Sequence, residues 1–205
     1  MPKEEKPLDT LARYLPEGTY PMVEQFLHQH KIHLTITRER SSILGDYRHA
    51  VNGKNHRISV NGNLNSYAFL LTLLHEIAHL LTFQQYGNRV QSHGKEWKKD
   101  FSQLLRYFLQ SHTFPPDIEN AVRNSLNNPA ASSCADDDLT RVLRRYDKDG
   151  DQLLFVEDLP PASLFRIKGN RIFRKGEKIR KRIQCTEVKT GRVYLFSPVY
   201  EVEKV

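Results

Sequence analysis

Three side chains that can bind a metal ion and move a proton lie within the five residues HEIAH: His75, Glu76 and His79. In an α-helix the two histidines, four residues apart, lie on one face about one turn from each other. Glu76 is rotated by about a quarter turn from His75, toward the side where the metal keeps an open position. Two imidazole ligands and a general base on one rigid helix form the HExxH arrangement. This spacing therefore predicts a zinc site with its own proton acceptor.

The surrounding sequence argues against a chance match. The motif interrupts LLTLLHEIAHLLTFQQYG, residues 70–87, which otherwise has the leucine content of a buried helix. A buried polar group without a partner costs about 1–3 kcal/mol, so three such groups in one apolar helix need a reason to be there. Metal binding supplies that reason, and a helix that happens to carry three polar residues is the alternative.

A catalytic zinc site usually has three protein ligands and one open position, so a third ligand is expected downstream. The candidates are His93, Glu96, Asp100 and His112. We favour His93, because Gly94 after it permits close backbone approach and a helix N-terminus favours the neutral imidazole that binds metal. Glu96, one turn further on, is the second choice. Asp100 would suit a hydrogen bond to a ligand imidazole, and His112 is expected at the surface or in a helix cap.

The chain around this motif switches between helical and strand periodicity. Apolar residues spaced by three and four predict helices, and alternating apolar residues predict strands. An Asn-Gly pair between two of the strands favours a hairpin. The expected helices cover residues 8–30, 66–86, 93–111, 117–126 and 138–147, and the expected strands cover 31–38, 41–50 and 56–61.

Length and composition suit one domain with a small appendage. The 205 residues are 39% hydrophobic and 27% charged, which are ordinary values for a soluble globular protein. No apolar run approaches the ~20 residues of a membrane span, and the N-terminus lacks the apolar segment of a secretory signal. We therefore expect a cytoplasmic protein with no membrane partner. The two cysteines, Cys134 and Cys185, support neither a disulfide framework nor a cysteine-ligated zinc site.

The excess of positive charge lies in the C-terminal fifth of the chain. Residues 162–205 contain 12 lysines and arginines against 4 acidic residues, whereas the other 161 residues contain 19 against 20. From Leu159 onward the pattern is short strands and turns. We therefore expect an α+β protein with a first domain over 1–128, a linker with a short helix over 129–158, and a basic β-rich unit over 159–205.

The basic unit has two interpretations of about equal weight. As a nucleic-acid surface, its cations would contact phosphates and Phe173 would stack on a base. As a solvated face of a small β-unit, the same strands would place Phe173 and Ile179 in their own core. The cations concerned are Lys168, Arg171, Arg174, Lys175, Lys178, Arg180, Lys181 and Arg182.

Residues 147–158, DKDGDQLLFVED, match part of an EF-hand loop, with aspartates at positions one, three and five. Gln152 stands where such a loop needs glycine, and Asp158 replaces the bidentate glutamate. Pro160 and Pro161 follow at once and leave no clear partner helix. We therefore interpret the stretch as an acidic turn and not as a calcium site.

The sequences LLHEIAH and SHGKEWKK together resemble the SprT-like metallopeptidase family, which includes the Spartan-type proteases that degrade DNA–protein crosslinks. The resemblance covers roughly residues 20–110. It implies a zincin-like fold, one zinc ion held by His75, His79 and His93, and Glu76 as the general base. It also implies a peptidase that acts on proteins, often DNA-associated ones, so a protein substrate and DNA are the expected partners.

The C-terminal part departs from the pattern of that family. Many members carry a four-cysteine zinc ribbon after the peptidase domain, whereas residues 159–205 contain one cysteine, Cys185, and no histidine. A second zinc site is therefore not expected there. The unit is interpreted as a metal-free version of that ribbon.

The expected mechanism is hydrolysis of a peptide bond, in which Glu76 takes a proton from the attacking water and passes it to the leaving amine. The strand over 56–61 is a candidate edge strand with which an extended substrate would pair, and a core strand with the same sequence pattern is the alternative. One competing interpretation is a non-catalytic binding module with a structural zinc ion, in which Glu76 would have no chemical role. Another is a metal-dependent hydrolase that acts on something other than protein, because HExxH specifies the zinc and the base but not the substrate.

Overall fold

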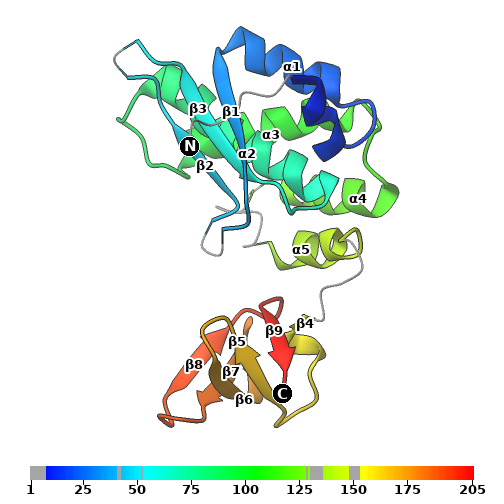
Figure 1. Ribbon diagram of the computed structural model, residues 1–205, viewed down its shortest axis with the longest axis vertical. Coiled ribbons are helices and arrows are strands. Elements are labelled where there is room, and N and C mark those ends of the chain that lie inside the picture. Colours follow the sequence, from blue (N-terminus) through cyan, green and yellow to red (C-terminus); the bar gives the residue numbers. More distant parts are fainter. Residues whose placement is uncertain (1–7, 41–42, 52, 128, 130–135, 148–152) are drawn as a thin grey trace. The chain divides into compact units, whose positions relative to one another are not determined.

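The computed structural model describes residues 8–40, 43–51, 53–127, 129, 136–147 and 153–205 (Figure 1). The chain divides into two compact units, Met1–Asp147 and Lys148–Val205. The first combines helices with a three-stranded sheet, and the second is built on a six-stranded sheet. Each unit has its own hydrophobic core. The α+β class expected from the sequence is confirmed.

Local sequence explains the helix boundaries of the first unit. The helix expected over residues 8–30 is divided into two, because Pro16 and Gly18, the latter at φ +80°, lie between them. The helices expected over 66–86 and 93–111 are present. In chain order the elements are η1 (Leu8–Tyr14), α1 (Tyr20–Gln29), β1 (Ile32–Thr37), β2 (Gly45–Arg48), β3 (His56–Asn61), α2 (Ser66–Tyr86), α3 (Lys95–Leu109), α4 (Pro116–Ser125) and α5 (Asp137–Arg144).

The three-stranded sheet has the order β1-β3-β2, with β1 parallel and β2 antiparallel to β3. The expected pairing of β2 with β3 is confirmed, although Asn52 of the Asn-Gly turn lies outside the described residues. The expectation that residues 56–61 form an edge strand is wrong. Ile58 and Val60 of β3 are almost fully buried, as the middle strand of a sheet packed on a helix requires. The sheet edge beside α2 is formed by β2 instead.

Helix α2 is the central helix of the first unit. Asn65 caps its start by accepting a hydrogen bond from the Ala68 backbone N–H at 2.9 Å, and Gly87 follows its last residue. With a mean hydropathy of 1.3 over 18 residues, α2 is long and apolar enough, by length and composition, to span a membrane. The expectation that the chain contains no such segment is therefore wrong. In this structure 61% of that window is buried inside the protein. Its apolar character is therefore accounted for by packing in the core.

The short helix expected within the linker over residues 129–158 is α5, and it packs into the core of the first unit. Leu139 and Leu143 are buried among the residues of that core. The Asn65 side-chain amide donates to the Leu143 carbonyl at 3.0 Å and to the Asp147 carboxylate at 2.6 Å. These contacts attach the helix to the start of α2. Asp147 is thus engaged within the first unit, and residues 148–152 of the EF-hand-like stretch lie outside the described residues.

The second unit is an antiparallel sheet with the strand order β4-β9-β5-β6-β7-β8. Its core contains Phe165 and Phe173, whose rings stack at 5.7 Å, together with Phe196. Alternation along the strands places these side chains on one face. The elements are β4 (Leu154–Phe155), η3 (Val156–Asp158), β5 (Leu164–Ile167), β6 (Arg171–Ile179), β7 (Arg182–Glu187), β8 (Val193–Phe196) and β9 (Glu201–Lys204).

Candidate metal centre

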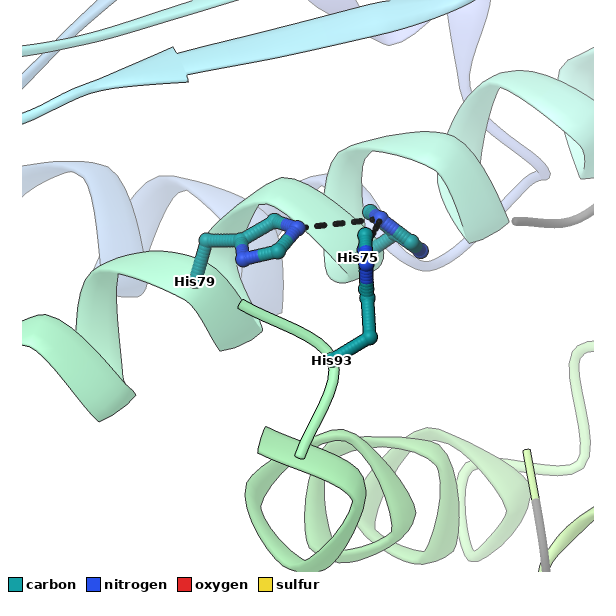
Figure 2. A group of neighbouring side chains, drawn as sticks. All are labelled: His75, His79 and His93. Carbon is teal, nitrogen blue, oxygen red and sulfur yellow. Dashed lines mark hydrogen bonds between the residues drawn. The ribbon is translucent and has the colours of Figure 1, made fainter. Parts of the chain in front are cut away.

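The side chains of His75, His79 and His93 converge on one point beside α2 (Figure 2). The first two lie one turn apart on α2, and His93 reaches them from the loop that precedes α3. The Nε2 atom of His75 lies 3.1 Å from Nε2 of His79 and 3.2 Å from Nε2 of His93. Among the described residues, these three side chains form the group whose ligand atoms, all within 4.8 Å of one another, could hold a metal ion. Three convergent imidazoles provide the donor set of a zinc site with an open position.

The electrostatics of the cluster keep the imidazoles neutral. Burial, together with the neighbouring His79 and His93, lowers the pKa of His75 to about 3. Burial, with a contribution from His93, likewise lowers the pKa of His79 to about 4, and burial is the main cause of the lowered pKa of His93. A metal ion binds the neutral imidazole, so no proton has to be displaced near neutral pH. The donor set and its protonation state both fit a divalent metal.

An aromatic wall from α3 fixes the position of the histidines. The Trp97 ring is fully buried and lies 4.7 Å from the His75 ring, 5.3 Å from His79 and 4.7 Å from His93, measured between centroids. Phe101, one turn further along α3, packs on Trp97 at 5.0 Å. Side chains held by packing present their donor atoms with little loss of rotamer freedom on binding. Helix α3 thus holds the three histidines in place by packing, and the loop that precedes it brings His93 to the other two.

Glu76 is buried beside the cluster, against the edge strand β2. A Cβ atom at Gly45 would lie 2.6 Å from the Glu76 Oε1 atom and 2.8 Å from the Thr72 methyl. Burial is the main cause that raises the pKa of Glu76 to about 8; the charge of Asp46 contributes in the same direction and that of Arg40 opposes it. A carboxylate with a pKa near neutrality can both take up and release a proton. Glycine at this position lets the strand approach the carboxylate closely.

Two residues outside the predicted site, Gly45 and Arg40, shape the surroundings of Glu76. The Arg40 guanidinium donates to the Asn61 side-chain oxygen at 2.8 Å and to the Ser59 hydroxyl at 3.0 Å. It also donates to the Leu44 carbonyl at 3.3 Å, immediately before β2. A glycine inside a predicted strand was the available signal for Gly45. Nothing in the local pattern singles out Arg40, because its partners lie on β3.

Of the other ligand candidates, the structure brings none into the cluster within the residues it describes. Glu96 lies near Lys95, whose Nζ is 3.8 Å from its Oε1. Asp100 is buried and accepts a hydrogen bond from the Thr82 hydroxyl at 2.7 Å. His112 follows the end of α3 in a left-handed conformation, at φ +52°. His93 is thus the candidate whose position suits a third ligand.

The basic residues of the second unit fall into two groups. Arg171 donates to the Glu187 carboxylate at 2.7 Å, and Lys175 donates to the backbone carbonyls of Glu157 and Leu159. Phe173 is fully buried, so it belongs to the core and the expectation that it stacks on a base is wrong. The remaining cations of the set are exposed or nearly so: Lys168, Arg174, Lys178, Arg180, Lys181 and Arg182.

Comparison with known proteins adds an independent finding for the first unit. A model of the SprT-like family matches residues 20–119. Protein SprT of Escherichia coli O157:H7 is 35% identical over 86 residues, covering 41% of this chain and 48% of that protein. Protein SprT of Glaesserella parasuis serovar 5 (strain SH0165) is 58% identical over 31 residues, covering 15% and 19%. The matches thus span less than half the length of either relative. No solved structure matches.

Proposed function

From the membership of residues 20–119 in the SprT-like family, we propose that this protein is a zinc-dependent metallopeptidase with a zincin-like first unit. The observation that carries the proposal is the convergence of three imidazole nitrogens beside a buried glutamate. The substrates are proteins, with DNA-associated proteins as the class that the resemblance favours. The proposal covers the activity, the metal and the substrate class.

The zinc ion would be held by His75, His79 and His93. Their Nε2 atoms meet at one place, and their lowered pKa values keep each imidazole neutral, with one ring nitrogen able to bind a metal. Zinc bound there would supply a Lewis acid that polarises the peptide carbonyl and makes water acidic enough to lose a proton. A three-imidazole set leaves room for water and substrate, which a closed structural site does not.

Glu76 acts as the general base. It accepts a proton from the attacking water and returns that proton to the leaving amine. Its pKa of about 8, raised chiefly by burial, lies close enough to neutrality for both transfers. A purely structural metal site would have no use for a buried carboxylate at this place, because burying a carboxyl group costs free energy.

The substrate chain would pair with β2. This strand is the edge of its sheet and passes Glu76 at Gly45. An extended peptide that adds to a sheet edge is held by main-chain hydrogen bonds, with little dependence on its side chains. The carbonyl to be cleaved would then lie beside the general base. Strand β3, in the middle of the sheet, has both neighbours occupied and does not offer such an edge.

The metal assignment is tested by elemental analysis of the full chain. We expect one zinc ion per chain in the wild type, and loss of that ion in the His93→Ala variant. The matched control is His112→Ala, which removes an imidazole outside the cluster and should leave the zinc content unchanged. Zinc retained by His93→Ala would contradict the proposed third ligand.

The activity is tested by following cleavage of a DNA-binding protein, with and without single-stranded DNA. Removal of a general base lowers the rate by about 10²–10⁴-fold, so we expect that loss in Glu76→Gln at unchanged zinc content. Faster cleavage with DNA would support DNA-associated substrates. Zinc without any cleavage by the wild type would favour a non-catalytic binding module. Equal rates for the variant and wild type would contradict the role of Glu76.

A further inference from the structure

Strand β8 ends the six-stranded sheet of the second unit. It pairs with β7 on one side, and among the described residues no strand pairs with its other side. The register places Val193 opposite Thr186 and Leu195 opposite Gln184. An exposed edge of this kind is a template for another extended chain.

The hydrogen-bonding pattern shows which backbone groups face outward. The Glu187 N–H donates to the Arg192 carbonyl at 2.9 Å, which makes these two residues a hydrogen-bonded pair. Hydrogen-bonded and non-hydrogen-bonded pairs alternate along an antiparallel ladder. The pairs Thr186–Val193 and Gln184–Leu195 are therefore non-hydrogen-bonded pairs. In such pairs the N–H and C=O groups of Val193 and Leu195 point away from β7. They offer donors and acceptors at the spacing of an extended peptide.

The side chains of the same two residues are unusually exposed for their type. Val193 is 56% exposed and Leu195 is 60% exposed. They lie two residues apart on one strand, so they share the face opposite to the core. Across the sheet, Arg174 lies opposite Thr186, which in turn lies opposite Val193. The face therefore combines two aliphatic side chains with an exposed guanidinium.

The charge around β8 selects the kind of partner. Residues 171–196 contain nine lysines and arginines and two glutamates, and one of these glutamates, Glu187, is paired with Arg171. Two copies of such a surface would repel each other, which disfavours pairing of β8 with a second copy of this chain. An acidic partner would be attracted. Charge complementarity of this kind raises the association rate and excludes unsuitable partners.

The aromatic residues of these strands distinguish a peptide from a nucleic acid. Phe173 and Phe196 are buried, and Tyr194 lies beneath the Arg171 guanidinium at 4.9 Å from its carbon. Binding of single-stranded nucleic acid generally uses exposed aromatic rings on which bases stack. Here the exposed large side chains on β8 are aliphatic. They suit the alternate side chains of an added strand better than the faces of bases.

We propose that the β8 edge binds an extended acidic peptide segment, which adds to the sheet as a further strand. Its backbone pairs with Val193 and Leu195, its alternate aliphatic side chains pack on theirs, and its carboxylates are attracted by the net positive charge of residues 171–196. This is the strand-addition mode of recognition. The proposal does not depend on the peptidase activity, since every residue that carries it lies in the second unit.

The test uses the full ¹⁵N-labelled chain and a seven-residue peptide in which valine and glutamate alternate. We expect binding that shifts the amide signals of Val193 and Leu195 and slows their hydrogen exchange by tenfold or more. Leu195→Lys and Arg174→Glu should each weaken binding about tenfold. The matched control is Arg57→Glu, the same charge reversal at an exposed residue of the first unit, which should have no effect.

Three outcomes would overturn the proposal. The first is no change in these amides at millimolar peptide. The second is equal binding of a peptide with lysine in place of glutamate, because charge would then have no part in recognition. The third is an oligothymidine that binds tighter than the acidic peptide and displaces it, which would assign the surface to nucleic acid. Both variants change exposed side chains, so an unchanged amide spectrum elsewhere in the second unit shows that the fold is kept.

Discussion

Helix α2 and strand β8 depart from the usual rule of burial in opposite directions. The apolar helix buries His75 and Glu76, whereas the strand, in the most basic part of the chain, exposes Val193 and Leu195. A buried polar group and an exposed large apolar group both cost free energy unless something compensates. In α2 the proposed compensation is a metal ion and a reaction, and on β8 it is a partner chain.

The comparison also shows how differently the two regions are built. The metal centre needs residues from α2, from the loop before α3 and from β2, so it depends on the tertiary structure of the whole first unit. The β8 edge needs two adjacent strands and their register. A centre assembled from distant segments can be disturbed from many positions, whereas an edge is disturbed mainly from its own strand.

The largest expected effect contrasts a core residue with an exposed one in the second unit. Phe173→Ala removes a fully buried ring and should lower the free energy of unfolding of that unit by about 3–5 kcal/mol. Leu195→Ala removes a side chain that is 60% exposed and should change it by less than about 0.5 kcal/mol. Hydrogen exchange measured on peptide fragments of the chain reports the stability of each unit separately. A comparable loss of unfolding free energy in Leu195→Ala would contradict the contrast between the two residues, because Leu195 would then be a core residue.

The second effect concerns the approach of β2 to Glu76. An alanine at Gly45 would place its methyl group 2.6 Å from the Glu76 Oε1 atom, so the carboxylate has to move. A displacement of this size at a catalytic group can lower the rate about 10²-fold. We expect that loss of cleavage in Gly45→Ala, with zinc content measured by elemental analysis unchanged.

A double variant separates the two neighbours of that methyl group. Thr72→Ala, added to Gly45→Ala, removes the Thr72 methyl that the new side chain would also meet at 2.8 Å. If Glu76 is the affected residue, cleavage stays low in the double variant. Full recovery would mean that the clash with Thr72 caused the loss, and Gly45 would then have no special relation to Glu76.

The smallest effect is a pH slope of the metal-free protein. His75 and His79 have pKa values lowered from 6.5 to about 3 and about 4, so their contribution to stability is lost as the pH falls below 6.5. Glu76, with its pKa raised from 4.5 to about 8, acts oppositely, and its contribution is lost as the pH rises through that range. Between pH 4.5 and 6.5 the effect of Glu76 on the pH slope of the unfolding free energy therefore cancels that of about one of the two histidines.

Glu76→Gln removes that offset. In the metal-free variant the free energy of unfolding should rise with pH more steeply than in the wild type, by about 1.4 kcal/mol per pH unit over this range. Denaturant unfolding monitored by Trp97 fluorescence at several pH values measures both slopes. The control is Glu177→Gln, an exposed carboxylate of the second unit. Parallel slopes for wild type and Glu76→Gln would mean that Glu76 is not buried as described.

The sequence by itself determined the parts that depend on local periodicity. The spacing of His75, Glu76 and His79 fixes their relation on one helix, because four residues make about one turn wherever that helix lies. The helix over 66–86 followed from its composition and its caps, Asn65 and Gly87. The uneven charge of the chain likewise pointed to a distinct C-terminal unit, and the structure has a unit boundary at Asp147.

Tertiary structure decided whatever depends on contacts between distant segments. The sequence left His93 and Glu96 as alternatives for the third ligand, and only the path of the chain before α3 brings His93 to the other two histidines. Strand order placed β3 in the middle of its sheet and β2 beside Glu76, which alternation along a strand does not reveal. Packing likewise decided that Phe173 is buried and Leu195 is not. Periodicity tells which residues share a face, whereas the neighbours that cover that face come from elsewhere in the chain.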